Sequence, residues 1–353
     1  MTRSFVLAAP RVRLAGPADE PAIARFVAGA RDATAFHRPE WLRAVTRAAG
    51  HECHVLLAGR EDAIAALLPL HAVHSPLFGR ALVSIGFAVG GGMIGDGAHV
   101  DDLAAAAQRL AARLACGTVE WRGGPLPTGA GWRVRTDSHA GFVRPLAADD
   151  AAQLTAIPRK QRAEVRKGLD HPLEVRVGRG AGDRAMHYAV YAESVRNLGT
   201  PVFPRALFDA VLDGFGDDAD ILTVLADGRP VSSVLSLYHR GAVMPFWGGG
   251  VFAARALRAN DVMYYRLMGH ARRRGCDRFD FGRSKTDSGA YHFKRNWGFV
   301  PEPLSYAHWT ADGAQSRDVD PLSPRYRARI ALWQKLPLPL ANWLGPLIAR
   351  GLA

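Results

Sequence analysis

The side chains best suited to chemistry lie close together in one segment, FDFGRSKTDSGAYHFKRNWGF, at residues 279–299. Asp280 lies in a short predicted strand, and a carboxylate there can orient or deprotonate an amine nucleophile. Lys294 offers a cation that can stabilise the oxyanion formed when such an amine attacks a carbonyl carbon. We therefore predict these two residues to be catalytic. Three neighbouring side chains are predicted to bind substrate: Arg283, Lys285 and Tyr291.

A structural interpretation of the same segment is also open. Phe279, Phe281 and Trp297 are large apolar residues of the kind that fill a core. Asp280 can cap the loop that follows it, and Lys294 can lie on a solvated surface. The acyl-transfer prediction therefore depends on whether the fold brings Asp280 and Lys294 to one site.

A second candidate is the cationic segment PRKQRAEVRKG at residues 158–168. On a helix its arginines recur on one face, which can hold phosphates through several charge-assisted hydrogen bonds. The predicted substrate-binding residues here are Arg159, Lys160, Arg162 and Arg166. The alternative is a solvated basic face with Glu164 as its local counter-charge. Four of the chain's five lysines lie in these two segments, which favours a need for a compact ammonium group there.

The whole chain is basic and lacks the usual signs of a metal module or secretion. Its 353 residues carry 45 Lys+Arg against 33 Asp+Glu, a formal net charge of +12, which favours polyanionic partners. The three cysteines form no C-x-x-C pair, so we predict no metal site, and their odd number favours a reducing compartment. The apolar run near the amino terminus is too short for a signal peptide, and no run reaches the about 20 apolar residues of a membrane span. We expect a cytoplasmic protein.

Hydrophobic periodicity and turn residues predict an α+β architecture that is used twice. The second half contains a strand, two helices, three meander strands, a helix and two strands. Their predicted ranges are 173–178, 183–197, 204–214, 221–249, 260–274, 277–282 and 304–309, with hairpin turns at Asp227-Gly228 and Arg240-Gly241. The first half repeats this order in degenerate form. We therefore predict domains at 1–150 and 151–310, followed by a linker and a basic amphipathic tail at 311–353.

This element order resembles that of acyl-CoA N-acetyltransferase (GNAT) domains. The runs FDFG, AYHFKRNWGF and PLSYAHW are similar to the carboxy-terminal signature of the Fem-type (FemAB-like) transferases of that superfamily. PRKQRAEVRKG and FHRPEWLRAV resemble two further helices of the same group. The run LPLPLANWLGPLIARGLA in the tail resembles the subgroup linked to exosortase/PEP-CTERM and exopolysaccharide gene clusters.

The resemblance implies two tandem GNAT-like domains with central mixed, mostly antiparallel sheets. It implies transfer of an acyl or aminoacyl group to an amine of a cell-envelope precursor, either peptidoglycan or exopolysaccharide, by direct attack on a thioester or aminoacyl ester. The donor would be acyl-CoA or aminoacyl-tRNA, and no cofactor would be bound permanently. Carried over, Lys294 falls close to the acyl transfer, Asp280 lies on the strand that lines the same cleft, and Arg159 and Arg162 are candidate phosphate contacts.

One departure leaves other functions open. In ordinary GNAT enzymes a Q/R-x-x-G-x-G/A loop holds the CoA pyrophosphate, whereas here AARALRAND precedes the corresponding helix. Gly248, Gly249 and Gly250 stand earlier, where they can allow a close backbone approach to an anion or can end a strand with a bulge. The alternatives are a non-catalytic RNA- or polyanion-binding protein and a plain CoA-dependent N-acetyltransferase.

The tail at residues 323–353 combines cations, tryptophans and prolines. Its prolines interrupt any helix long enough to span a bilayer, but a basic amphipathic segment can lie on a membrane surface. We expect either a peripheral contact with the inner face of the cytoplasmic membrane or packing across the two domains. The sequence does not determine the oligomeric state.

Overall fold

The computed structural model describes residues 11–60, 63–76, 78–314 and 324–352, and the chain divides into two compact units. Unit 1 comprises Met1–Arg135, Ser305–Asp318 and Gly351–Ala353, and unit 2 comprises Thr136–Leu304 and Val319–Arg350. The chain enters unit 2 within strand β7 (Trp132–Pro145) and returns to unit 1 within strand β13 (Glu302–Thr310).

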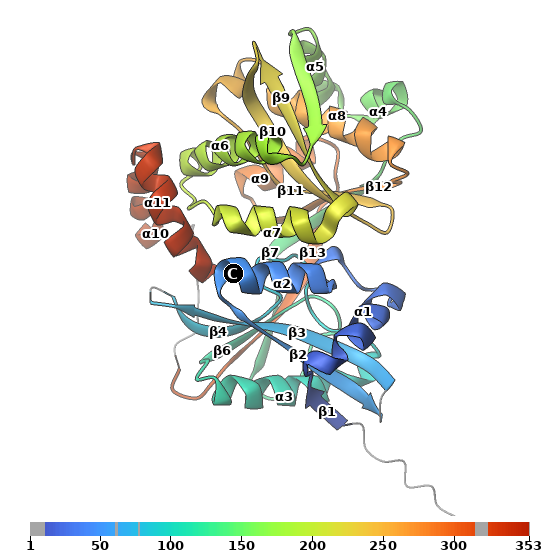
Figure 1. Ribbon diagram of the computed structural model, residues 1–353, viewed down its shortest axis with the longest axis vertical. Coiled ribbons are helices and arrows are strands. Elements are labelled where there is room, and N and C mark those ends of the chain that lie inside the picture. The colour runs from blue at the N-terminus through green and yellow to red at the C-terminus, as the bar shows by residue number, and fades with distance from the viewer. Residues whose placement is uncertain (1–10, 61–62, 77, 315–323, 353) are drawn as a thin grey trace, which may run out of the picture. The chain divides into compact units, whose positions relative to one another are not determined.

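In unit 1 the strands follow the order β1-β2-β3-β4-β6-β13, with β5 paired to β3. The further strands are β1 (Arg11–Leu14), β2 (Glu52–Arg60), β3 (Ala63–Ser75), β4 (Gly79–Ser84), β5 (Ile94–Gly95) and β6 (Thr118–Arg122). Helices α1 (Glu20–Gly29) and α2 (Pro39–Ala49) cover one face, and α3 (Val100–Arg113) covers the other (Figure 1). The alternation of strand side chains explains both layers, because Leu57 and Leu67 pack with α1 while Leu56 and Leu68 pack with α3.

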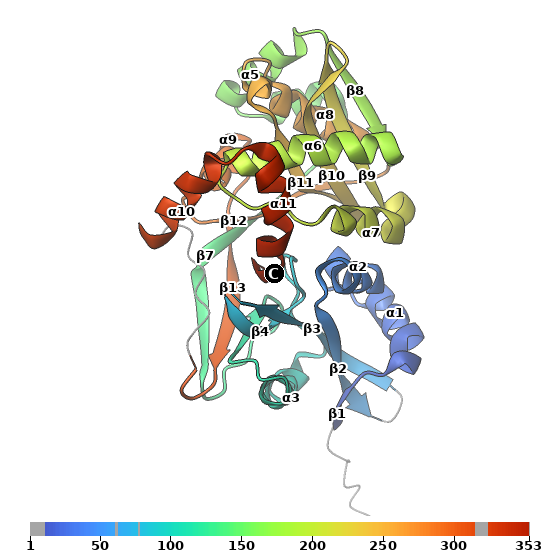
Figure 2. The same cartoon turned by 60° about the vertical axis from the view of Figure 1, so that its left-hand side comes forward.

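In unit 2 the strand order is β7-β12-β11-β10-β9-β8. These strands are β8 (Leu173–Gly178), β9 (Ala219–Ala226), β10 (Arg229–His239), β11 (Ala242–Gly250) and β12 (Arg278–Lys285). The helices are α4 (Asp150–Ala156), α5 (Arg159–Leu169), α6 (Ala181–Asn197), α7 (Arg205–Phe215), α8 (Ala259–Arg273) and α9 (Gly289–Asn296). Helices α6 and α7 cover one face of the sheet and α8 covers the other (Figures 1 and 2).

The strands of the two units follow the same plan. In each, three antiparallel pairs are followed by one parallel pair, β4·β6 or β11·β12, and then by an antiparallel pair. The predicted α+β class and the mixed, mostly antiparallel sheets are confirmed. Both predicted hairpin turns are present, with left-handed φ values of 49° and 72° at Asp227 and Gly228 and of 48° and 75° at Arg240 and Gly241.

The limits of the units differ from the predicted domains at 1–150 and 151–310. β7 follows β6 in sequence, but its later residues pair with β12 of unit 2; β13 follows β12, but pairs with β6 of unit 1. The chain therefore changes units within two strands, at Arg135/Thr136 and at Leu304/Ser305. The side-chain alternation of a strand continues across such a point, so the sequence pattern carries no sign of it.

The tail contains two helices, α10 (Pro324–Gln334) and α11 (Leu338–Ala349), which group with unit 2 and lie beside α6 (Figures 1 and 2). Most of the predicted linker, residues 315–323, lies outside the described residues. Among the helices that the structure describes, none has both the length and the apolar composition to cross a membrane.

Candidate active site

Strands β11 and β12 separate close to their beginnings. They pair in parallel at Ala242–Arg278 and Val243–Phe279, and Asp280 is the next residue of β12. On its other edge β12 pairs with β7, and here Asp280 pairs with Val143 while Arg283 pairs with Gly141. Two residues of β12, 281 and 282, therefore lie opposite one residue of β7, which is a β-bulge. Gly282 takes a left-handed φ of 66° within this bulge. Asp280 therefore stands where the two strands part and where β12 bends.

Lys294 on α9 reaches back to this bulge. The residue is only 9% exposed, and Nζ donates a hydrogen bond of 2.9 Å to the carbonyl oxygen of Arg283. The Nζ atom also lies 5.3 Å from the ring centroid of Phe142 and 5.6 Å from that of Phe281. The backbone carbonyl and the two ring faces stabilise a cation that is otherwise withdrawn from water.

Asp280 and Lys294 influence each other's ionisation. Burial lowers the pKa of Lys294 to about 8, and the negative charge of Asp280 limits that fall. Burial raises the pKa of Asp280, whereas the amide of Gly282, which donates to Oδ1 at 2.8 Å, and the charge of Lys294 act to lower it. The fold thus brings the two residues predicted to be catalytic into one partly desolvated site.

Aromatic rings enclose this pair. Tyr291, a predicted substrate contact, packs edge-on against Phe142 with centroids 5.4 Å apart. Tyr264 of α8 packs edge-on against Phe281 at 4.7 Å. The core interpretation of the other aromatic residues is correct, because Phe279, Phe281 and Trp297 are 1%, 5% and 0% exposed. Of these rings, Phe142 and Phe281 form the apolar wall beside the Lys294 ammonium group.

The remaining predicted residues divide between two elements. Arg283 and Lys285 are partly buried on β12, next to the bulge. Arg159, Lys160 and Arg166 on α5 are exposed, and Arg162 is partly buried, while the buried side of α5 consists of Gln161, Val165 and Gly168. The predicted cationic face is therefore present and directed toward solvent.

The start of α5 adjoins the end of α9. Arg144 of β7 donates hydrogen bonds to the carbonyl oxygens of Ala156, just before α5, and of Trp297, just after α9. A Cβ atom built on Gly298 would lie 3.0 Å from Cδ of Pro158, so the two segments are in close contact. The structure thereby joins the two predicted clusters through a single arginine.

Helix α5 also lies against the first turns of α8. Nε2 of Gln161 donates to Oδ1 of Asp261 at 2.6 Å, and Glu164 forms ion pairs with Lys167 and Arg258. Burial raises the pKa of Asp261 to about 6. The carboxyl group of Asp261 therefore stands in the first turn of α8, where the pyrophosphate of CoA lies in ordinary GNAT enzymes, and a carboxylate opposes an anion there, whereas Glu164 is balanced by its two cationic partners. These residues do not fit a CoA pyrophosphate site of the ordinary kind.

The three glycines of β11 serve close packing. A Cβ atom would lie 2.9 Å from Cγ2 of Val234 at Gly248, 2.2 Å from Oγ of Ser194 at Gly249, and 2.4 Å from Oδ1 of Asn260 at Gly250. Helices α6 and α8 can approach β11 only because these side chains are absent. The β-bulge of this strand pair lies before the glycines, opposite Leu235/Ser236, so Gly248, Gly249 and Gly250 do not themselves form a terminal bulge.

The sequence analysis missed four residues of the site: Phe142, Arg144, Tyr264 and Gly282. Only Gly282 carried a local signal, since a glycine directly after an apolar strand is typical of a bulge. The other three lie far from residues 279–299 in sequence and act through tertiary contacts.

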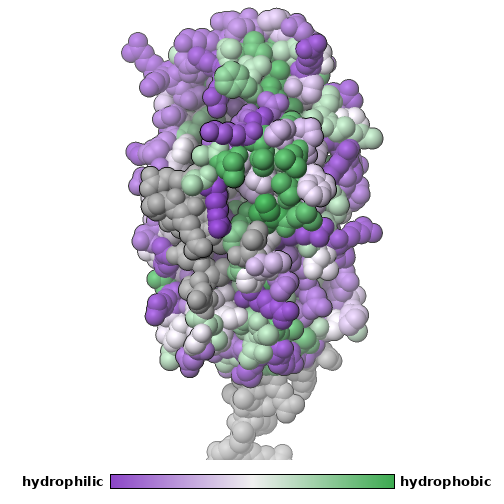
Figure 3. Space-filling view, turned by 90° about the vertical axis from the view of Figure 1, so that its left-hand side faces the viewer, coloured by the Kyte–Doolittle hydropathy of each residue, from purple (hydrophilic) through white to green (hydrophobic). Residues whose placement is uncertain are grey.

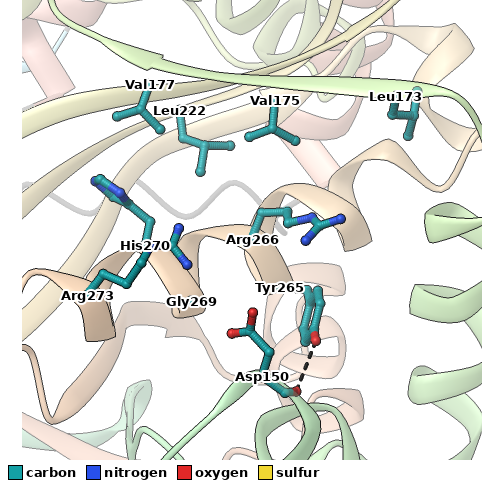
Figure 4. Close-up of a pocket in the computed structure, with 10 residues that line it drawn as sticks. All are labelled: Asp150, Leu173, Val175, Val177, Leu222, Tyr265, Arg266, Gly269, His270 and Arg273. Carbon is teal, nitrogen blue, oxygen red and sulfur yellow. Dashed lines mark hydrogen bonds between the residues drawn. The ribbon is translucent and has the colours of Figure 1, made fainter.

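A separate cavity of about 310 Å³ lies between α8 and strands β8 and β9 (Figure 4). Its lining consists of Asp150, Leu173, Val175, Val177, Leu222, Tyr265, Arg266, Gly269, His270 and Arg273. Figure 4 shows an aliphatic wall from the strands facing a polar wall from α8. None of the residues predicted from the sequence lines this cavity, so it is distinct from the Asp280–Lys294 pair.

Comparison with known proteins agrees with the fold. Residues 158–295 match the family described as "Acetyltransferase (GNAT) domain". No curated protein matches the chain. Among solved structures, the crystal structure of FemX aligns with a TM-score of 0.64 and 13% identity, over 85% of this chain and 98% of that one.

Two further structures align over most of their length. A tandem GNAT protein from the clavulanic acid biosynthesis pathway gives a TM-score of 0.56 at 10% identity, over 87% of this chain and 99% of that one. The C-terminal domain of a putative lysylphosphatidylglycerol synthetase from Agrobacterium fabrum gives 0.56 at 15% identity, over 83% and 93%. The chain thus has a GNAT acetyltransferase domain at residues 158–295, within a fold that is similar to those of FemX and of a tandem GNAT protein.

Proposed function

We propose that unit 2 transfers an acyl or aminoacyl group to an amine of a cell-envelope precursor. One observation carries the proposal: a buried lysine and the carboxylate that stands where β11 and β12 part shift each other's pKa inside a GNAT domain. Buried ionisable pairs with shifted pKa values are costly to keep, and such pairs concentrate at functional sites. The resemblance to Fem-type transferases and the FemX-like fold support this class of reaction.

In the proposed reaction the amine nitrogen attacks the carbonyl carbon of the donor directly. A new C–N bond forms, the carbonyl oxygen gains negative charge, and the C–O or C–S bond of the donor then breaks. The leaving hydroxyl or thiol takes up a proton, and the amine loses one. Asp280, with its pKa raised by burial, is placed to orient the amine and to accept that proton.

Lys294 would stabilise the oxyanion. An ammonium group has three N–H donors, and the Arg283 carbonyl uses one of them. With a pKa of about 8, the group is mostly protonated at neutral pH. In a site lined by Phe142 and Phe281 its charge is weakly screened, so it interacts strongly with a developing negative charge.

The proposed donor is an aminoacyl ester such as aminoacyl-tRNA. Asp261 opposes a CoA pyrophosphate at the start of α8, whereas the exposed cations of α5 suit a larger polyanion. A thioester donor bound in another way remains the alternative. The exopolysaccharide form of the acceptor rests on the resemblance of the tail to the exosortase/PEP-CTERM-associated subgroup.

A transfer assay tests the proposal. The purified chain is mixed with either a charged tRNA pool or acetyl-CoA, and with a nucleotide-linked muropeptide or an amino sugar polymer, and products are identified by mass spectrometry. We expect acylated acceptor with charged tRNA and little with acetyl-CoA. Product from acetyl-CoA alone would favour the plain acetyltransferase, and no product from any pair would contradict acyl transfer.

A second candidate is non-catalytic binding of RNA, which the exposed cations Arg159, Lys160 and Arg166 favour. It predicts binding to uncharged tRNA that weakens steeply with salt and no acyl product. Replacing Arg159, Lys160 and Arg166 with glutamine should then reduce the salt dependence. Tight tRNA binding without transfer would support this candidate over the first.

A further inference from the structure

We propose that helices α10 and α11 dock unit 2 onto an anionic lipid surface. The proposal rests on the arrangement of the tail and does not depend on the acyl-transfer reaction. It also selects between the two expectations for the tail that the sequence left open.

Helix α11 buries its small residues. Ala341, Gly345 and Ala349 recur at every fourth position, and all three are buried. A Cβ atom on Gly345 would lie 2.9 Å from Cγ1 of Val202, so the helix axis comes very close to the segment after α6. Helix α11 therefore packs within unit 2 through its smallest side chains, and the apolar area buried by this contact is small.

The large apolar residues of α11 point the other way. Leu340, Trp343 and Leu347 lie at i, i+3 and i+7 and are 40%, 67% and 59% exposed. Leu332 on α10 is 67% exposed. Figure 3 faces the side on which these helices lie and shows hydrophobic residues gathered there. An exposed apolar face of this kind marks a surface that binds something, since water contact with it is unfavourable.

The charge of the tail identifies the partner. Residues 324–352 contain five cations, Arg325, Arg327, Arg329, Lys335 and Arg350, and no aspartate or glutamate. A segment of this composition, with Lys335, Leu340, Leu347 and Trp343 exposed, complements anionic lipid headgroups above an acyl layer. Tryptophan is also the side chain that prefers the boundary between headgroups and acyl chains.

The length of the helices decides how they would bind. α11 has 12 residues, so it spans ~18 Å, well short of the ~30 Å hydrocarbon core of a bilayer. It can therefore lie along the surface but cannot cross it. The main chain of Gln334 accepts a hydrogen bond from Arg196, and its side chain donates one to Asn197, so α6 holds the end of α10 in place.

Vesicle sedimentation with the full chain tests the proposal. Wild-type protein is mixed with phosphatidylcholine vesicles, with or without phosphatidylglycerol. We expect binding to the anionic vesicles, and a loss of at least about tenfold in partitioning for the double variant Trp343→Ser/Leu347→Ser. Lys335→Glu should weaken binding to anionic vesicles about fivefold or more, with a smaller effect on neutral ones.

A matched control uses apolar residues exposed elsewhere in unit 2. Phe252 and Val300 are 72% and 73% exposed, so Phe252→Ser/Val300→Ser removes a comparable apolar surface and should leave vesicle binding within about twofold. Circular dichroism checks that all variants fold. Equal losses in both double variants, or no binding of wild type to anionic vesicles, would overturn the proposal. Self-association that Trp343→Ser/Leu347→Ser abolishes, without vesicle binding, would show instead that the face joins two copies of this chain.

Discussion

Units 1 and 2 have the same strand order, yet they differ immediately after the parallel pair. In unit 1, β4 and β6 pair over three positions up to Val83–Glu120, and the next residue of β6 is Trp121, which is 0% exposed. In unit 2 the pair ends at Val243–Phe279, and the next residue is Asp280. Counted from the first pair of each unit, Ala81–Thr118 and Ala242–Arg278, Glu120 and Asp280 hold the same position, but Glu120 is still paired with β4 whereas Asp280 lies beyond the last pair.

The segments that follow β6 in unit 1 and β12 in unit 2 also differ. In unit 2, α9 follows β12 and brings Lys294 back to the bulge. In unit 1, residues 123–131 contain no helix, and the buried cation of β6, Arg122, is paired with Glu120 at 2.6 Å. The repeated strand arrangement is therefore a scaffold, and the candidate chemistry depends on a returning helix that, within the described residues, only the second repeat has.

The largest expected effect is that of Lys294→Met. Removing the ammonium group from the proposed oxyanion site should lower kcat by about 100- to 1000-fold. The melting temperature should shift by less than about 5 °C, because loss of the bond to Arg283 is offset by relief of a buried charge. Steady-state kinetics and thermal unfolding measure the two effects.

The matched control lies in unit 1. Arg122→Met removes the ion pair with Glu120 inside the fold, so we expect about 1–3 kcal/mol of destabilisation with kcat changed less than about threefold. If Arg122→Met lowered kcat as much as Lys294→Met, the functional contrast between the units would be wrong.

A smaller effect is expected for Asp280→Asn. The amide oxygen can still accept the hydrogen bond from Gly282, but the group can no longer accept a proton, so kcat should fall about 10- to 100-fold. Because Asp280 raises the pKa of Lys294, the variant should also lose activity at lower pH than wild type. If the alkaline limb of the pH–rate profile stayed unchanged in Asp280→Asn, the charge of Asp280 would not set the pKa of Lys294.

The pH dependence of the wild-type rate tests the role of the Lys294 cation directly. The cation of Lys294 is lost as pH rises through about 8, so kcat should fall about tenfold between pH 7 and pH 9. Lys294→Arg keeps a cation throughout this range and should move the alkaline limb beyond pH 9, whatever its effect on the maximal rate. An unchanged limb in Lys294→Arg would assign the titration to another group.

The smallest expected effect concerns stability at the start of α8. The pKa of Asp261 is raised from 3.8 to about 6, so the folded state binds more protons than the unfolded state between these values. The free energy of unfolding should therefore fall as pH rises from about 4 to 6. Asp261→Asn keeps an acceptor for Gln161 and should add about 1–2 kcal/mol at pH 7.

Helix α3 of unit 1 supplies the control for that prediction. Asp101 lies in its first turn and is exposed, so Asp101→Asn should change the unfolding free energy by less than about 0.5 kcal/mol. Urea unfolding of both variants at pH 4 and pH 7 gives the comparison. A fall in stability from pH 4 to 6 that persists in Asp261→Asn would show that another carboxyl group causes it.

Local features of the structure could be predicted from the sequence with good accuracy. Alternating apolar residues and the turns at Asp227-Gly228 and Arg240-Gly241 predicted the meander of β9, β10 and β11. Periodic arginines predicted the exposed face of α5. These features depend on residues within one or two turns of chain, so their physical causes are contained in the local pattern.

The local sequence pattern accounts for most of the elements of unit 2, for the two hairpins and for the identity of the ionisable residues, but helix α9 was not predicted from it. Only the tertiary structure decided that the chain changes units within β7 and β13, that Phe142 and Arg144 support the Asp280–Lys294 site, and that α11 exposes its leucines. The reason is that each of these outcomes depends on contacts between segments far apart in the chain. Such contacts come from packing many surfaces at once, and no local pattern records which surfaces meet.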